Sequence, residues 1–350
     1  MSNEMRSDMT SYALYDLYAI GNALVDTEYE VTDEQLVTMG VSKRHMTLID
    51  CARRSELEAQ VTGAPAHRSG GGSAANTVVA LAQLGGKACY ACRVADDEPG
   101  RFYASDLMAY GVASNLSKGL TATDQTGSCM VLVTPDAERS MCTFLGATSL
   151  LDDTALQAES IAASKIYYME GYLAASPSGL AAALKGRTLA QEAGVALAAT
   201  LSDVSMINHC REGLDAIVGN AQTGALDYLF CNEEEAQAWC GQQDISKICR
   251  QINALARVVC ITRSAKGCLV LRGTQQTEVP AAKVKAIDTN GAGDMFAGAF
   301  LYAVTHGHSH SQAAWLANQC AAQVVAQYGN RLGQAAIAAL QADFARYLAS

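Results

Sequence analysis

The strongest constraint on the fold is a regular alternation of short apolar runs with longer alanine-rich segments. Runs typical of buried strands occupy residues 17–26, 87–95, 165–173, 228–235 and 258–263. Segments with helical periodicity occupy residues 73–85, 99–111, 176–194 and 233–241. This order predicts a doubly wound α/β fold, in which helices cover both faces of a mainly parallel sheet. Ligands of such folds bind beyond the carboxyl ends of the strands.

Two stretches break this alternation, at about residues 25–47 and 125–146. The second predicts a β-hairpin that turns at Pro135 and Asp136. Such a hairpin either extends the edge of the sheet or forms a lid over a substrate. Because no repeat or linker is visible, we expect one domain over residues 1–350. Its small β lid is expected to use segments around residues 22–50 and 120–146.

The composition limits the partners of the chain. A net charge of −10 disfavours nucleic acid and anionic membranes, because both attract an excess of Lys and Arg. No apolar run is long enough for a spanning helix, and residues 1–12 lack the apolar region of a signal peptide, so we expect a cytoplasmic protein. Its 12 cysteines suit reduced, buried thiols. Cys89 and Cys92 should face opposite sides of the sheet, which argues against a shared metal or redox pair.

The sequence DTNGAGDMFAGAF, residues 288–300, carries the clearest chemical signal. We expect a strand up to Ile287, then a glycine turn, then a helix with Asp294 in its first turn. One reading is that Asp294 only complements the helix dipole. The other is that the N–H groups of Gly291, Ala292 and Gly293 hold developing negative charge while Asp294 accepts the proton of an attacking hydroxyl. Two glycines and two acids at this spacing favour the second reading.

Residues 288–294 resemble the C-terminal signature of the ribokinase or PfkB family of small-molecule kinases. The segments SGGGSAANTVVALAQLG, VADDEPGRFYASDLMAYGV and NEEE resemble further family motifs, in the family's order, from about Gly21 to Gly329. The resemblance implies a ribokinase-like fold with a β lid, the substrate ATP and the cofactor Mg²⁺. It also implies that Asp294 is the general base and that residues 291–293 form the anion hole.

The nucleotide half is identified in the same way. Asn232 and Glu235 fit a helix capping box, and the resemblance implies that they organise Mg²⁺ through water together with the phosphates. Kinship with some members also implies a monovalent cation such as K⁺ near Asp288. The resemblance further implies that Thr262 and Gly267 bind the nucleotide, in a turn where Ser264 replaces the usual glycine. It also implies that Asn318 lies on a helix beside the adenine. There is no P-loop lysine motif.

The acceptor side has two polar clusters. A lone Asp or Asn is usually a cap, but here the clusters resemble the family's polyol clamp. They contain Asn22, Asp26, Gly71, Gly72, Ser73 and Asn76. Arg139, on the expected lid, is a candidate for closing on the transferred phosphate, because guanidinium geometry fits phosphate oxygens; the alternative is a solvated hairpin residue.

The identity of the acceptor is less constrained. The motif G-N-x-L-x-D and the segments AERS, EGYLAASPSG and LFCNEEEA are more similar to the adenosine kinase branch than to bacterial ribokinases. Met46 stands where that branch often has a polar side chain, which weakens base recognition. Four apolar side chains are expected to face a purine, namely Leu24, Leu48, Met141 and Leu173.

We therefore predict ATP-dependent phosphorylation of a primary hydroxyl of adenosine or a related nucleoside. The alternatives are a kinase for a free sugar such as ribose or fructose, and a sensor without turnover. A monomer and a homodimer both remain open. The closely spaced His306, His308 and His310 predict an exposed turn, in which Ser309 or Ser311 caps the next helix, rather than a metal site.

Overall fold

A nine-stranded sheet forms the centre of the computed structural model, which describes residues 13–350 except 44–45, 62, 64, 121–123, 137 and 221–222. Residues 1–12, which are expected to contain no signal peptide, lie outside the described residues. Short parts of both expected lid segments also lie outside them. None of the helices in the described part of the chain combines the length and apolar character needed to cross a membrane.

The strand order of the large sheet is β14-β13-β12-β11-β10-β9-β1-β5-β6. Neighbouring strands from β12 to β6 are parallel, whereas β13 and β14 are added antiparallel at one edge. The strands are β1 Tyr15–Ile20, β5 Ala88–Ala91, β6 Ala113–Ser114, β9 Ser164–Met169, β10 Ala196–Thr200, β11 Leu226–Asn232, β12 Ala256–Thr262, β13 Cys268–Arg272 and β14 Gln275–Val279. The predicted α/β class and its mainly parallel sheet are confirmed.

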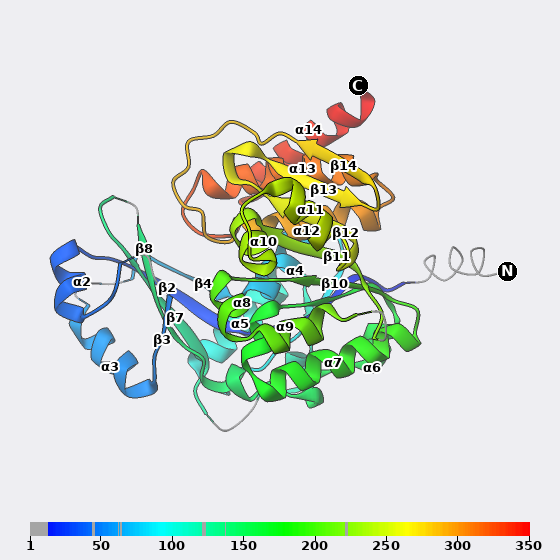
Figure 1. The fold of residues 1–350 in the computed structure, drawn as a ribbon. Coiled ribbons are helices and arrows are strands. Elements are labelled where there is room, and N and C mark those ends of the chain that lie inside the picture. Colours follow the sequence, from blue (N-terminus) through cyan, green and yellow to red (C-terminus); the bar gives the residue numbers. More distant parts are fainter. Residues whose placement is uncertain are drawn as a thin grey trace.

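Helices cover both faces of this sheet (Figure 1). One face carries α4 Ser73–Gln83, α5 Glu98–Ala109, α12 Ala292–Thr305, α13 His310–Val325 and α14 Gln334–Ala349. The other carries α6 Ala158–Ala162, α7 Pro177–Glu192, α8 Val204–His209, α9 Arg211–Val218, α10 Glu233–Cys240 and α11 Ile245–Ile252. Short 3₁₀ turns are η2 Asn115–Lys118, η3 Gly146–Leu150, η4 Asp153–Ala155, η5 Gly171–Ala175 and η6 Ser264–Lys266.

Each face of the sheet has its own apolar core, because side chains alternate along a strand. In β1, Leu17 packs into the core beneath α12, whereas Tyr18 packs into the core beneath α7. Cys89 and Cys92 likewise belong to opposite cores, as predicted. The cysteines of the described residues are free thiols, and most of them are buried.

A second sheet of five strands projects from one side of this body (Figure 1). Its order is β3-β8-β7-β2-β4, with strands β2 Leu24–Glu30, β3 Met46–Leu48, β4 His67–Gly71, β7 Gly127–Val133 and β8 Arg139–Phe144. β7 and β8 form the predicted antiparallel hairpin. Helices α2 Asp33–Met39 and α3 Cys51–Gln60 cover one face of it. Met130 and Leu132 point into that small core, so their neighbours in β7, Cys129 and Val131, point the other way.

The prediction of a strand that runs up to Ile287 is wrong. The chain leaves the sheet at Pro280 and runs without regular structure to the start of α12. β14 is already the edge strand, and the N–H groups of Ile287 and Asp288 donate to the carbonyl of Val325 at the end of α13. In this segment a helix carbonyl accepts the hydrogen bonds that a neighbouring strand would otherwise accept. The apolar composition of the segment does not reveal this. Ser309 does cap α13, in a capping box with Gln312.

Candidate active site

A cavity of about 360 Å³ lies between the carboxyl edge of the large sheet and the uncovered face of the small sheet. The large sheet supplies side chains that follow its strands, such as Asn22 after β1, Glu170 after β9 and Asp203 after β10. The small sheet supplies Asp26 from β2 and an apolar wall. The cavity therefore lies where the topology of a parallel sheet places ligand sites.

Asp294 faces this cavity from the first turn of α12. Its Oδ1 accepts a hydrogen bond from Ser73 Oγ at 2.6 Å, and its Oδ2 accepts one from Asn76 Nδ2 at 3.0 Å. Burial raises the pKa of Asp294 from 3.8 to about 6, although both hydrogen bonds favour the charged form. This carboxylate is fixed in orientation and is able to accept a proton near neutral pH.

The turn before α12 presents backbone donors to the same cavity. Gly291 has φ +73°, and a Cβ there would lie 2.6 Å from the Cβ of Asn330, so only glycine fits. The Gly291 and Gly293 N–H groups donate to no acceptor among the described residues, whereas the Ala292 N–H reaches Thr289 O at 3.4 Å. Free N–H groups at a helix start favour a bound anion.

Glu170 organises the acceptor side, and sequence reasoning missed its role. Its Oε1 accepts from Asn22 Nδ2 at 2.8 Å, and its Oε2 accepts from the Ala74 N–H at 2.8 Å. Burial raises the pKa of Glu170 to about 7. It thereby joins the end of β1 to the start of α4. Its position directly after the apolar run of β9 was the available signal, because that edge of the sheet faces the ligand.

Asp26 points into the cavity from β2, and no donor among the described residues gives its carboxylate a hydrogen bond. Burial raises its pKa to about 7, and Arg331 partly opposes this. Gly71 lies against it: a Cβ on Gly71 would be 2.3 Å from Asp26 Oδ1. Gly71 itself does not line the cavity, whereas Gly72, Ser73 and the nearby Asn76 do. The two predicted polar clusters thus meet in space.

Arg139 does not line the cavity. Its guanidinium, with the side chain 10% exposed, donates from Nη1 to Glu28 Oε1 at 2.9 Å and forms an ion pair from Nη2 to Asp288 Oδ2 at 2.8 Å. Arg139 and Glu28 belong to the small sheet, whereas Asp288 begins the glycine turn. Arg139 therefore connects the small sheet to the loop that leads to the free N–H groups of the glycine turn.

The signature of the pfkB family of carbohydrate kinases matches residues 41–336, which include the cavity loops. The chain belongs to this family. An adenosine kinase from Sinorhizobium meliloti is 34% identical and superimposes with a TM-score of 0.86 over 94% of this chain and 100% of that one. A probable sugar kinase from Rhizobium etli is 33% identical, with a TM-score of 0.86 over 95% of this chain and 99% of that one. A ribokinase from Mus musculus is 29% identical over 66% of this chain and 70% of that protein.

These similarities confirm the ribokinase fold and the PfkB assignment. The chain is a phosphotransferase that uses an alcohol group of a nucleoside or sugar as acceptor. They leave open which acceptor it uses, because the relatives include both classes of kinase.

The Asn232–Glu235 pair forms a capping box at the start of α10, and both residues also line the cavity. Burial raises the pKa of Glu235 to about 7, and the carboxylates of Asp203 and Asp294 contribute to this rise. Buried carboxylates that repel one another fit a nearby cation, and oxygen donors suit Mg²⁺. Among the described residues, no three acidic, His or Cys side chains are arranged to hold an ion directly.

The other residues expected to bind nucleotide lie away from the cavity lining. Thr262 ends β12, and Gly267 has φ +86° and packs against the carbonyl of Val279. Ser264, in place of the family glycine, has φ +49°, a left-handed conformation that is strained for serine. Asn318 Nδ2 donates to the carbonyls of Val279 and Pro280 at 3.0 and 3.1 Å, so this amide fixes the end of β14.

The charged side chains that line the described cavity are all acidic: Asp26, Glu170, Asp203, Glu235 and Asp294. An anionic acceptor would meet electrostatic repulsion here, and a neutral one would not.

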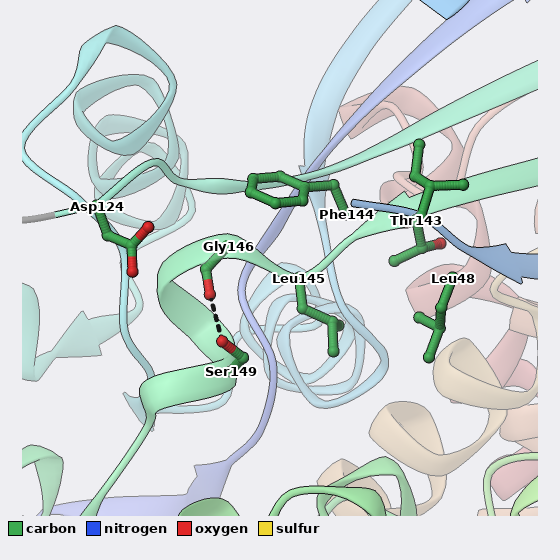
Figure 2. Close-up of a pocket in the computed structure, with 8 residues that line it drawn as sticks. Leu48, Asp124, Thr143, Phe144, Leu145, Gly146 and Ser149 are labelled. Atoms are coloured by element: carbon green, nitrogen blue, oxygen red, sulfur yellow. Dashed lines mark hydrogen bonds between the residues drawn. The ribbon is translucent and has the colours of Figure 1, made fainter. Parts of the chain in front are cut away.

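The apolar wall contains Leu24, Met46, Leu48 and Met141, with Met46 paired in register with Met141. The expectation for Leu173 is wrong, because η5 turns Leu173 fully into the core and leaves Tyr172 at the cavity. Next to this wall is a second pocket of about 260 Å³ (Figure 2). It shares Leu48, Thr143, Leu145 and Ser149 with the main cavity, and Ser149 Oγ donates to Gly146 O at 2.7 Å.

Proposed function

We propose that the protein transfers the γ-phosphate of ATP to a primary hydroxyl of adenosine or a related nucleoside. The observation that carries this proposal is the position of Asp294. Its carboxylate is held by hydrogen bonds from Ser73 and Asn76. It lines the same cavity as Gly291 and Gly293, whose N–H groups are free. A proton acceptor beside an anion-binding turn is what an attacking alcohol and a transferring phosphoryl group require.

On the acceptor side, Asp26 accepts hydrogen bonds from sugar hydroxyls, and Asn22 and the backbone around Gly72 hold the other side of the ring. Asp26 is suited to this because it points into the cavity without a protein donor. The apolar wall with Leu24, Met46 and Met141 then accommodates a nucleobase. This wall favours a nucleoside over a free sugar, because a sugar alone would leave it facing water.

On the phosphate side, Asp294 removes the proton from the hydroxyl, and the amides of residues 291–293 stabilise the negative charge on the phosphoryl oxygens. Glu235 and Asp203 would hold Mg²⁺ through water, and the ion would supply charge neutralisation of the phosphates. The nucleotide binds near Thr262 and Gly267 and along the exposed loop before Asp288. Its adenine lies beside α13, which carries Asn318. Arg139 supports the phosphate position through Asp288.

The five-stranded sheet acts as the lid. Its outer face is already covered by α2 and α3, whereas its inner face lines the cavity. The inner face therefore packs against the acceptor, and closure excludes water from the transfer step.

The test is an ADP-release assay with MgATP and adenosine, inosine, ribose, fructose or fructose 6-phosphate at equal concentration. We expect adenosine to give the highest kcat/KM and fructose 6-phosphate to give none, because of the acidic lining. A higher kcat/KM for ribose or fructose would replace the nucleoside with a sugar. No ADP above the Asp294→Asn background with any acceptor would contradict the kinase mechanism at this site.

A further inference from the structure

The carboxylate of Asp288 is enclosed by the protein and already has a positively charged partner. Its side chain is 1% exposed. Oδ1 accepts from the Asn290 N–H at 3.0 Å, and Oδ2 accepts from the Gly329 N–H at 3.3 Å and lies 2.8 Å from Arg139 Nη2. Both oxygens of Asp288 are therefore occupied by groups of this chain.

This arrangement does not fit the monovalent cation that the family resemblance implies near Asp288. A buried carboxylate is stabilised by a nearby positive charge, which a bound K⁺ or a fixed side chain can supply. Here Arg139 supplies it, and burial raises the pKa of Asp288 while Arg139 lowers it. A guanidinium is suited to such a buried site because it is always charged and is weakly hydrated.

The surroundings of Arg139 keep it in this position. Glu28 on β2 binds the other terminal nitrogen, so the guanidinium is held between two carboxylates. Asp26 lies on the same strand and contributes a further negative charge to this region. The ring of Tyr328 lies 6.0 Å from Arg139 Cζ, at the edge of cation–π range.

We propose that Arg139 is the built-in cation of the anion-binding turn, so that this kinase works without a monovalent cation. Because Arg139 is carried by β8, the negative charge of Asp288 is compensated only when the small sheet lies against the turn. Arg139 is thus a positioning residue that couples the lid to the donors of residues 291–293. The rate measurement below rests on the proposed function, whereas the thermal measurement does not.

The experiment compares the parent protein and Arg139→Gln in about 100 mM KCl and in choline chloride at the same ionic strength, which keeps screening equal. The parent should change by less than about 2-fold in turnover, and its melting temperature should be the same in both salts. Arg139→Gln should lose turnover in choline and regain about 5-fold or more in KCl, or with low-millimolar methylguanidinium. Its melting temperature should rise in KCl, because a cation then binds the folded state.

Two variants serve as controls. Glu28→Gln removes the other carboxylate partner of Arg139 and should create no response to K⁺. Arg139→Gln combined with Asp288→Asn should lose the response, because the carboxylate that attracts the cation is gone.

Activation of the parent by K⁺ by about 5-fold or more would overturn the proposal. The proposal would also be overturned if Arg139→Gln folds and its turnover and melting temperature are the same in KCl and in choline chloride. If no acceptor is phosphorylated by any variant, the proposed function fails, and the melting temperatures alone still decide the role of Arg139.

Discussion

Replacing Asp294 with Asn should remove catalysis and at the same time stabilise the protein without ligand. Asn has nearly the shape of Asp, and its Oδ1 still accepts the hydrogen bond from Ser73 Oγ, but it cannot accept the proton of the acceptor. Its Nδ2 replaces the oxygen that accepts from Asn76, so the Asn76 amide has to flip and accept through its unpaired Oδ1. A general base contributes roughly 10²–10⁴-fold to a rate, so turnover should fall by that factor. Adenosine and ATP binding should be largely retained.

The stability effect follows from the pKa of Asp294. Burial raises it from 3.8 to about 6, which is about two pKa units, and each unit corresponds to about 1.36 kcal/mol. The folded state binds a proton on Asp294 more tightly than the unfolded state does. The charged carboxylate therefore destabilises the folded state, and this effect is complete above about pH 6. The penalty for its charge is then about 3 kcal/mol, and it disappears as the pH falls below 3.8. Asn avoids this penalty.

The assay is urea unfolding of both proteins at pH 8 and pH 5, together with ADP release and adenosine titration. We expect Asp294→Asn to gain about 1–3 kcal/mol at pH 8, and to gain less at pH 5, where part of the parent's Asp294 is protonated. The pH 5 measurement is an internal control for changes in packing. Turnover within a few-fold of the parent would refute the general base, and an equal stability difference at both pH values would refute the electrostatic reasoning.

Three further changes test other parts of the site. Asp26→Ala should raise the KM for the acceptor about 10–100-fold, the loss expected for a charged hydrogen bond, and an unchanged KM with adenosine would remove Asp26 from the clamp. Glu235→Gln should raise the Mg²⁺ concentration for half-maximal rate by about 10-fold without lowering the melting temperature, because Gln keeps one oxygen for the capping box and removes a buried charge; a Mg²⁺ titration decides this. Ser264→Gly should stabilise by up to about 1 kcal/mol in urea unfolding by relieving the left-handed backbone, whereas Ala265→Gly in the same turn should not; equal effects would contradict this reasoning.

Local pattern was sufficient for much of the fold. The alternation of apolar runs and helical segments predicted β1, β5, β9, β11 and β12 and the helices α4, α5, α7 and α10, because buried strands appear as short apolar runs and helices as longer periodic segments. The hairpin was predictable from its turn residues. The segment before Ile287 was not, because its apolar residues would suit a strand, and only the position of α13 shows that no strand partner remains there.

The sequence by itself determined the family, the α/β class and the identity of the groups that carry charge and accept protons, because these depend on short contiguous motifs such as residues 288–294. The tertiary structure decided which of those groups meet. Ser73 and Asp294 are 221 residues apart in the chain, and the role of Glu170 was recognised from its contacts with Asn22 and Ala74. It also showed Arg139 paired with Asp288. The physical reason is that burial and charge pairing depend on neighbours in space, which a motif does not record.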